Sequence, residues 1–107
     1  MGTWRLVEHS QFGASAQGLL LYHPNGSMAV VITGRLSKKG KAEESVIAYA
    51  GRYRVEGAIV VHDPTVSDDP ARIGAEQKRF ATLRGGMLIL SETRDLAKGL
   101  VVQWQRV

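Results

Sequence analysis

The chain has 107 residues, the size of a single domain built on one hydrophobic core. Hydrophobic residues make up 44% of it and charged residues 22%, and this balance excludes an intrinsically disordered chain. Because it contains no cysteine, disulfides, thiolate nucleophiles and cysteine-based zinc sites are excluded as well. We expect one domain over residues 1–107.

The net charge of +4 permits an anionic partner such as nucleic acid. Four basic residues between positions 35 and 41 form the one compact basic cluster, but Glu43 and Glu44 follow at once. Nucleic-acid modules usually pair a basic face with stacking aromatic residues, and no two aromatic residues lie near this cluster. We expect a solvated surface here and no nucleic-acid partner.

The N-terminal residues show no basic stretch leading into a long apolar run. No apolar run approaches the ~18 residues that a membrane-spanning helix needs. We therefore expect a cytoplasmic protein without a membrane partner.

Short apolar runs separated by turn residues dominate the chain and predict eight strands. These cover residues 3–9, 18–23, 27–33, 51–56, 58–62, 76–83, 87–91 and 100–107. Pro24-Asn25-Gly26 predicts a hairpin between the second and third strands, because Asn and Gly tolerate the positive φ of a tight turn.

Two segments break the strand pattern. Residues 41–50 are rich in Ala and Glu, place Ala42, Val46 and Ala50 on one helical stripe, and precede Gly51, a residue type that often caps helices. They predict one short helix. Further on, Asp69 is placed to cap a single helical turn begun by Pro70.

Eight short strands joined mostly by tight turns indicate an antiparallel meander, and closure into a barrel removes its exposed edges. An open sheet packed on the helix is the competing geometry, but a ten-residue helix is too small to cover eight strands. We therefore predict an all-β, eight-stranded antiparallel up-and-down barrel with one short helix at about 41–50. In it, Trp4 lies near Trp104, and the first strand lies beside the last.

Several stretches, spread in order over nearly the whole chain, together resemble the bacterial and fungal lipocalin-like domain family of small stand-alone proteins. They are GTWRLV (2–7), GLLLYHPNGSMAVVI (18–32), AYAGRYRVEG (48–57), EQKRF (76–80), MLIL (87–90), VQWQRV (102–107), and a spacing formed by His62, Ser67, Pro70 and Gly74. The resemblance implies a small antiparallel barrel with a helical plug or lid. It also implies a lumen that binds a small hydrophobic molecule, as lipocalin-like barrels in general do.

His62, at the end of the fifth predicted strand, is the first candidate for chemistry. An imidazole at a barrel mouth can act as acid, base or hydrogen-bond donor to a ligand, or it can simply cap the strand end. If the protein is an enzyme, His62 would transfer the proton and Tyr53 would orient the substrate. His9 and His23 also stand at strand ends, where exposed turn positions are expected.

An apolar cavity with a few hydroxyl groups would suit the tyrosines. Tyr22, Tyr49 and Tyr53, with Met28 and His62, are candidates to line one mouth; the alternative is that all five are ordinary core residues.

Two arginines on strands are candidates to bind an acidic group of a ligand. Arg79 lies within the sixth predicted strand. Arg106 shares its strand face with Trp104, so an inward face would make it a buried cation that binds either a ligand carboxylate or the first strand.

The histidines lack the spacings of metal ligands, and no P-loop, dinucleotide-binding or nucleophile-elbow motif is present. We expect neither a metal nor a cofactor.

Three functions remain open. The first is binding of a small, largely hydrophobic or amphipathic molecule in a lumen of roughly 300 Å³ or more. The second is a cofactor-independent isomerase or cyclase acting on a hydrophobic biosynthetic intermediate. The third is a structural or interaction module that forms a homodimer.

Overall fold

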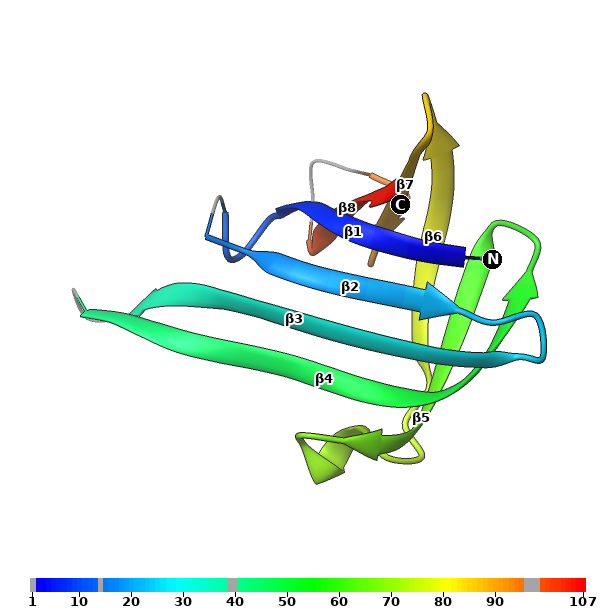
Figure 1. Cartoon of the computed structure of the whole chain (residues 1–107), viewed down its shortest axis with the longest axis horizontal. Helices are drawn as coiled ribbons and strands as arrows, with labels where there is room; N and C mark the ends of the chain where they lie inside the picture. The colour runs from blue at the N-terminus through cyan, green and yellow to red at the C-terminus, as the bar shows by residue number, and fades with distance from the viewer. Residues whose placement is uncertain (1, 14, 39–40, 96–98) are drawn as a thin grey trace.

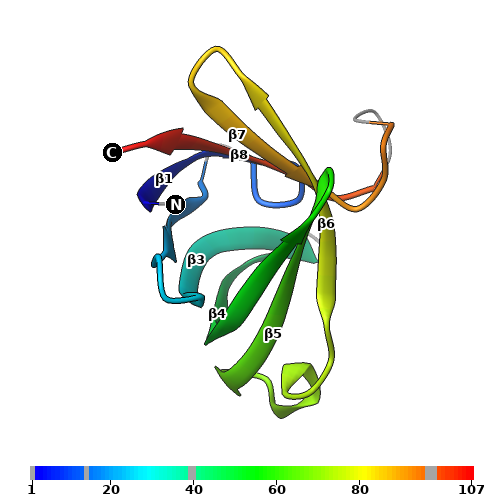
Figure 2. The ribbon, with the colours of Figure 1, turned by 90° about the vertical axis from the view of Figure 1, so that its right-hand side faces the viewer.

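The computed structural model describes residues 2–13, 15–38, 41–95 and 99–107, with residues 36–38 and 41–43 described by their backbone alone. Each strand pairs antiparallel with the next, and the last pairs with the first, so the sheet is a closed barrel of eight strands (Figures 1 and 2). The strands are β1 (Gly2–His9), β2 (Gln17–Tyr22), β3 (Ser27–Lys38), β4 (Lys41–Glu56), β5 (Ile59–Ser67), β6 (Gln77–Arg84), β7 (Met87–Ser91) and β8 (Val101–Arg106). The predicted barrel is confirmed.

The barrel closes where β1 meets β8. Leu6 pairs with Trp104 and Trp4 pairs with Arg106 across this seam. Trp4 and Trp104 are 6% and 2% exposed and belong to one core cluster, as the sequence predicts. Two indoles packed inside the seam bury a large apolar area, which favours closure.

The β3–β4 hairpin extends beyond the strands that flank it. β2 pairs with β3 only over residues 28–33, and β5 pairs with β4 only over residues 49–56. Residues 34–38 and 41–45 therefore pair only with each other and form the arm that projects from the barrel in Figure 1. Phe12 lies against this arm at Gly34, where an added Cβ would lie 2.6 Å from the ring carbon Cγ.

The predicted helix at 41–50 is wrong, because these residues form the first part of β4. An isolated ten-residue helix is marginal in water, whereas here every residue of the segment pairs with β3. The side chains follow the two-residue period of a strand: Ile47 and Tyr49 pack against the core, while Val46 is 51% exposed. Gly51 lies at a bulge against β5, where a Cβ would collide with the backbone of Asp63 and Thr65.

After β5, which extends to Ser67, the chain makes one short turn of 3₁₀ helix, η1 (Pro70–Arg72). Asp69 caps it by accepting a hydrogen bond from the Ala71 N–H, as predicted. No helix in the described ranges has the length and apolar character that crossing a membrane would require.

Candidate functional site

A cavity of about 210 Å³ lies inside the barrel and is lined by residues of all eight strands and by Arg72 of η1. Apolar side chains make most of its surface; they include Leu20, Val30, Ile32, Ile47, Leu90 and Val102. Its polar side chains are His9, Tyr49, His62, Arg72, Gln77, Arg79 and Trp104. The lumen is thus an apolar chamber with a limited number of hydrogen-bonding groups, which is the usual composition of a small-molecule site.

The cavity is smaller than the volume of roughly 300 Å³ expected for a drug-sized ligand. Large core side chains occupy the rest of the lumen. Trp4, Tyr22 and Met28 are each less than 10% exposed and do not line the cavity. The free space in the lumen is therefore small.

The side chains of Tyr22, His62 and Tyr49 form a hydrogen-bonded chain that leads from the core to the cavity. The Tyr22 hydroxyl lies 2.5 Å from Nε2 of His62, and the Tyr49 hydroxyl lies 2.7 Å from its Nδ1. Neighbouring strands place these groups together, because β3 connects the strand of Tyr22 to that of Tyr49 and β5 carries His62 beside β4. Both ring nitrogens of His62 are therefore engaged by tyrosines.

Burial determines the protonation states of Tyr22, His62 and Tyr49. Desolvation, with a smaller contribution from the nearby Arg79 cation, lowers the pKa of His62 to about 4, so its ring is neutral at pH 7. Desolvation raises the pKa of Tyr49 to about 12 and that of Tyr22 further still. All three groups are uncharged near neutral pH.

The two arginines that line the cavity differ in their partners. Arg72 forms an ion pair with Asp68 at 2.7 Å. Arg79 donates to the Lys78 carbonyl oxygen at 2.8 Å and to Gln77 Oε1 at 3.3 Å, and in the described ranges no carboxylate pairs with it. Arg79 thus brings a positive charge without a neighbouring negative one to the edge of the cavity.

His9 is a cavity residue that sequence analysis missed. It is 1% exposed, although its place at the end of a strand suggested a turn residue. Strict alternation after Trp4 and Leu6 would point Glu8 inward, but the pairing of β1 with β8 shifts register between Leu6 and Glu8. This bulge turns His9 into the barrel, and no residue type in the sequence signals it.

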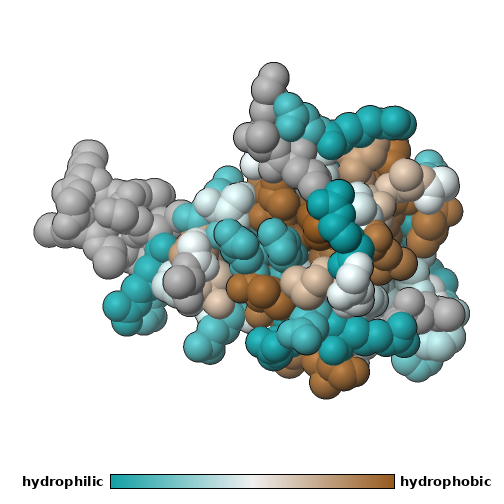
Figure 3. All heavy atoms as spheres, turned by 90° about the horizontal axis from the view of Figure 1, so that it is seen from above, coloured by the Kyte–Doolittle hydropathy of each residue, from teal (hydrophilic) through white to brown (hydrophobic). Residues whose placement is uncertain are grey.

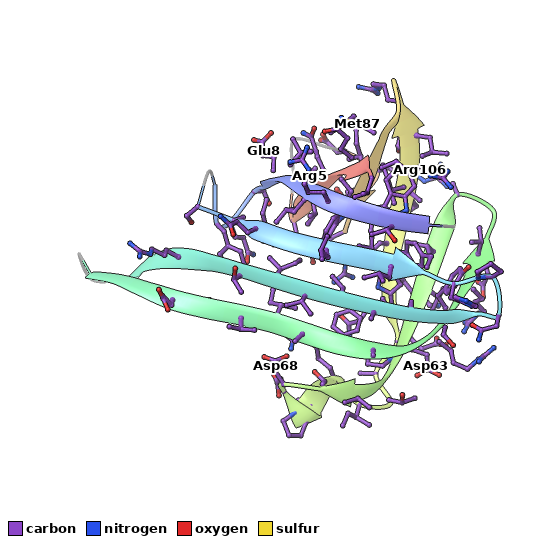
Figure 4. The ribbon with its side chains drawn as sticks, in the orientation of Figure 1. Arg5, Glu8, Asp63, Asp68, Met87 and Arg106 are labelled. Atoms are coloured by element: carbon purple, nitrogen blue, oxygen red, sulfur yellow. The ribbon has the colours of Figure 1, made fainter. Side chains whose placement is uncertain are left out.

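Other predicted site residues lie outside the cavity. The Tyr53 ring packs against the Tyr22 ring at a tilt of 55°, with centroids 4.7 Å apart, and its hydroxyl donates to the backbone oxygen of His23 at the exposed turn. Arg106 is exposed and lies over the Trp4 ring, 5.7 Å from its centroid, beside the start of β1 and away from Asp68 near η1 (Figure 4). The structure therefore brings together Tyr49, His62 and Arg79 from the predicted set. The catalytic roles of His62 and Tyr53 stay predictions.

In the described part of the chain, no group of three His, Cys, Asp or Glu residues is arranged to hold a metal ion. Of the basic cluster at 35–41, Lys39 lies outside the described residues, and Arg35 lies 3.8 Å from Glu44 as an exposed ion pair.

A closed eight-stranded antiparallel barrel with a small, mostly apolar internal chamber is the architecture of lipocalin-like proteins. The family model described as a lipocalin-like domain matches residues 1–107, and the chain belongs to this family. A search of curated proteins found no match to the chain.

Proposed function

We propose that this protein binds a small, largely hydrophobic molecule in the barrel lumen. The observation that carries the proposal is the chamber of about 210 Å³ inside the closed barrel, with apolar walls and polar groups at defined places. Apolar surface removed from water on binding supplies the affinity, and the polar groups orient the ligand.

The volume of the chamber limits the size of the ligand. A dry cavity of about 150 Å³ is large enough to bind benzene, and drug-sized ligands need about 300 Å³ or more. A chamber of about 210 Å³ fits one ring with one or two small substituents.

The charge of Arg79 favours a ligand with an anionic group. A guanidinium without a carboxylate partner at the edge of an apolar chamber attracts a carboxylate, which it can bind through two parallel hydrogen bonds. The ligand class that fits is a compact aromatic or cyclic acid.

Titrations with toluene and benzoate, followed by two-dimensional NMR and calorimetry, test this proposal. Both should perturb resonances of the cavity residues, and benzoate should bind more tightly. Arg79→Gln should weaken benzoate binding about tenfold, as expected for a hydrogen bond to a charged group, and leave toluene unaffected. Arg84→Gln, on the same strand but exposed and outside the cavity, is the matched control. Binding of neither probe would contradict the proposal.

A second function is homodimer formation through the outer face of β1–β3. Leu19, Leu21 and Val31 are 48%, 42% and 48% exposed, and Leu19 pairs directly with Val31. They line an outer groove of about 590 Å³, and apolar residues also reach the surface on the face seen in Figure 3. Exposed apolar patches of this kind favour association. Sedimentation of the protein and of Val31→Lys tests it: a dimer that the variant converts to monomer supports it, and a monomeric protein contradicts it.

A further inference from the structure

Two buried hydrogen-bond donors lie in the cavity wall formed by β1 and β8. His9 and Trp104, which are 1% and 2% exposed, both line the cavity. Neither His9 Nε2 nor Trp104 Nε1 has a hydrogen-bond partner among the described residues. Buried polar groups are nearly always hydrogen-bonded in folded proteins, so these two atoms require an explanation.

The hydrogen bonds of His9 show that its Nε2 is a donor. Its Nδ1 accepts hydrogen bonds from the backbone N–H groups of Gln11 at 3.2 Å and Phe12 at 3.3 Å, so Nδ1 carries no proton. Burial lowers the pKa of His9 below its usual value of 6.5, so the ring is neutral at pH 7. The single ring proton is therefore on Nε2. The indole Nε1 of Trp104 is a donor in every state.

On the opposite wall, the hydrogen bonds of Tyr22 and His62 determine whether the Tyr49 hydroxyl is a donor to the cavity. Tyr22 is 7% exposed, and among the described residues its hydroxyl has no partner other than His62. Because the buried hydroxyl proton of Tyr22 needs an acceptor, the hydroxyl donates to Nε2 of His62. Nε2 therefore carries no proton, and the single ring proton of the neutral His62 is on Nδ1. His62 then donates to the Tyr49 oxygen, and the Tyr49 hydroxyl hydrogen is left to point to the cavity.

The chamber thus presents donors from both walls: His9 and Trp104 on one side, Tyr49 and Arg79 on the other. In a closed ring of eight strands, β8 and β1 face β4 and β5 across the lumen. We propose that the ligand carries a second, uncharged acceptor oxygen, such as a ketone carbonyl, which is held by His9 Nε2–H and Trp104 Nε1–H. This inference rests on the proposed function and names its ligand class as a small cyclic keto acid.

Trp4 provides an internal comparison. Its Nε1 is also buried and without a partner among the described residues, but Trp4 does not line the cavity. It is therefore outside the proposed subsite, and a Trp4→Phe variant removes the same chemical group at a place where no ligand contact is expected.

The test compares probes that differ only in the acceptor: 3- and 4-acetylbenzoate against 3- and 4-isopropylbenzoate, which have nearly the same shape. At least one acetyl isomer should bind about tenfold more tightly than its isopropyl counterpart, as one or two additional hydrogen bonds would give. His9→Asn, which retains an acceptor near the Nδ1 position, and Trp104→Phe should each reduce this ratio. Trp4→Phe should leave it unchanged.

The indole N–H resonance of Trp104 gives a readout that needs no variant. It should shift downfield with the acetyl probe and not with the isopropyl probe. Equal affinities for the acetyl- and isopropylbenzoates, with the indole resonance of Trp104 unmoved, would mean that His9 Nε2–H and Trp104 Nε1–H contact only water. That result would overturn this inference and leave binding in the lumen intact. If toluene and benzoate do not bind either, the proposed function fails and this inference fails with it.

Discussion

The Tyr22 hydroxyl lies 2.5 Å from Nε2 of His62, although 40 positions separate the two residues in the chain. The barrel thus joins the second strand to the fifth through one buried polar contact. On the other side of the imidazole, Tyr49 connects this contact to the cavity. The stability of the core and the presentation of a donor to the lumen depend on the same ring.

Tyr22→Phe tests the structural side of this contact. The variant leaves Nε2 of the buried His62 without its partner, so we expect the free energy of unfolding to fall by about 1–3 kcal/mol in urea denaturation. Tyr53→Phe is the control, because its hydroxyl binds a backbone oxygen at the exposed turn. Equal losses in the two variants would contradict the importance of the buried contact.

Stability should depend on pH through His62. Its pKa is about 4 in the folded protein against 6.5 unfolded, so the unfolded chain binds a proton between these values and the folded protein does not. Stability should be full above pH 6.5 and fall by about 3 kcal/mol toward pH 4. His9, whose pKa burial also lowers, adds to the loss. Urea denaturation at pH 7.5, 6, 5 and 4.5 measures this, and a flat profile would argue against buried neutral rings.

Gly51→Ala should destabilise the barrel by about 1–3 kcal/mol, as overpacking does. A methyl group there would collide with the backbone of Asp63 and Thr65 on β5, which has no side-chain rotamer with which to adjust. Hydrogen exchange should quicken along β4 and β5 more than along β7 and β8. Wild-type stability in the variant would show that the bulge can open without cost.

Arg106→Gln tests which of the two arginines predicted to bind an acidic group, Arg79 or Arg106, does so. Arg106 lies over Trp4 on the outside of the cavity, so benzoate affinity should stay the same while stability falls by about 0.5–1 kcal/mol. A benzoate titration and a melting curve on the same sample measure both. A loss of affinity equal to that of Arg79→Gln would move the anion site to the β1–β8 seam.

Strand order and closure were predictable because turn residues divide the chain into short apolar runs. The helix prediction failed at residues 41–50 for a physical reason. Helical spacing of Ala42, Val46 and Ala50 is a local property, whereas pairing with all of β3 is a long-range one that no window of sequence contains.

The candidate site was predictable in part. Tyr49, His62 and Arg79 could be chosen by residue type and strand position, and they meet at one cavity. His9 could not be, because a register shift within β1 decides which way it faces. Trp104 was predicted to lie near Trp4, and the N–H of its buried indole is seen to lack a partner among the described residues only when the partners of each polar atom are known.

The β1–β8 seam has a consequence for how affinity relates to folding. His9 and Trp104 come from opposite ends of the chain and meet only where the first strand pairs with the last. Contacts between residues so distant in sequence form slowly and late. The part of the cavity wall formed by His9 and Trp104 therefore exists only in chains in which β1 has paired with β8. A ligand of the proposed kind would touch both strands, so its binding would stabilise the paired ends of the chain and favour completely folded molecules over partly folded ones.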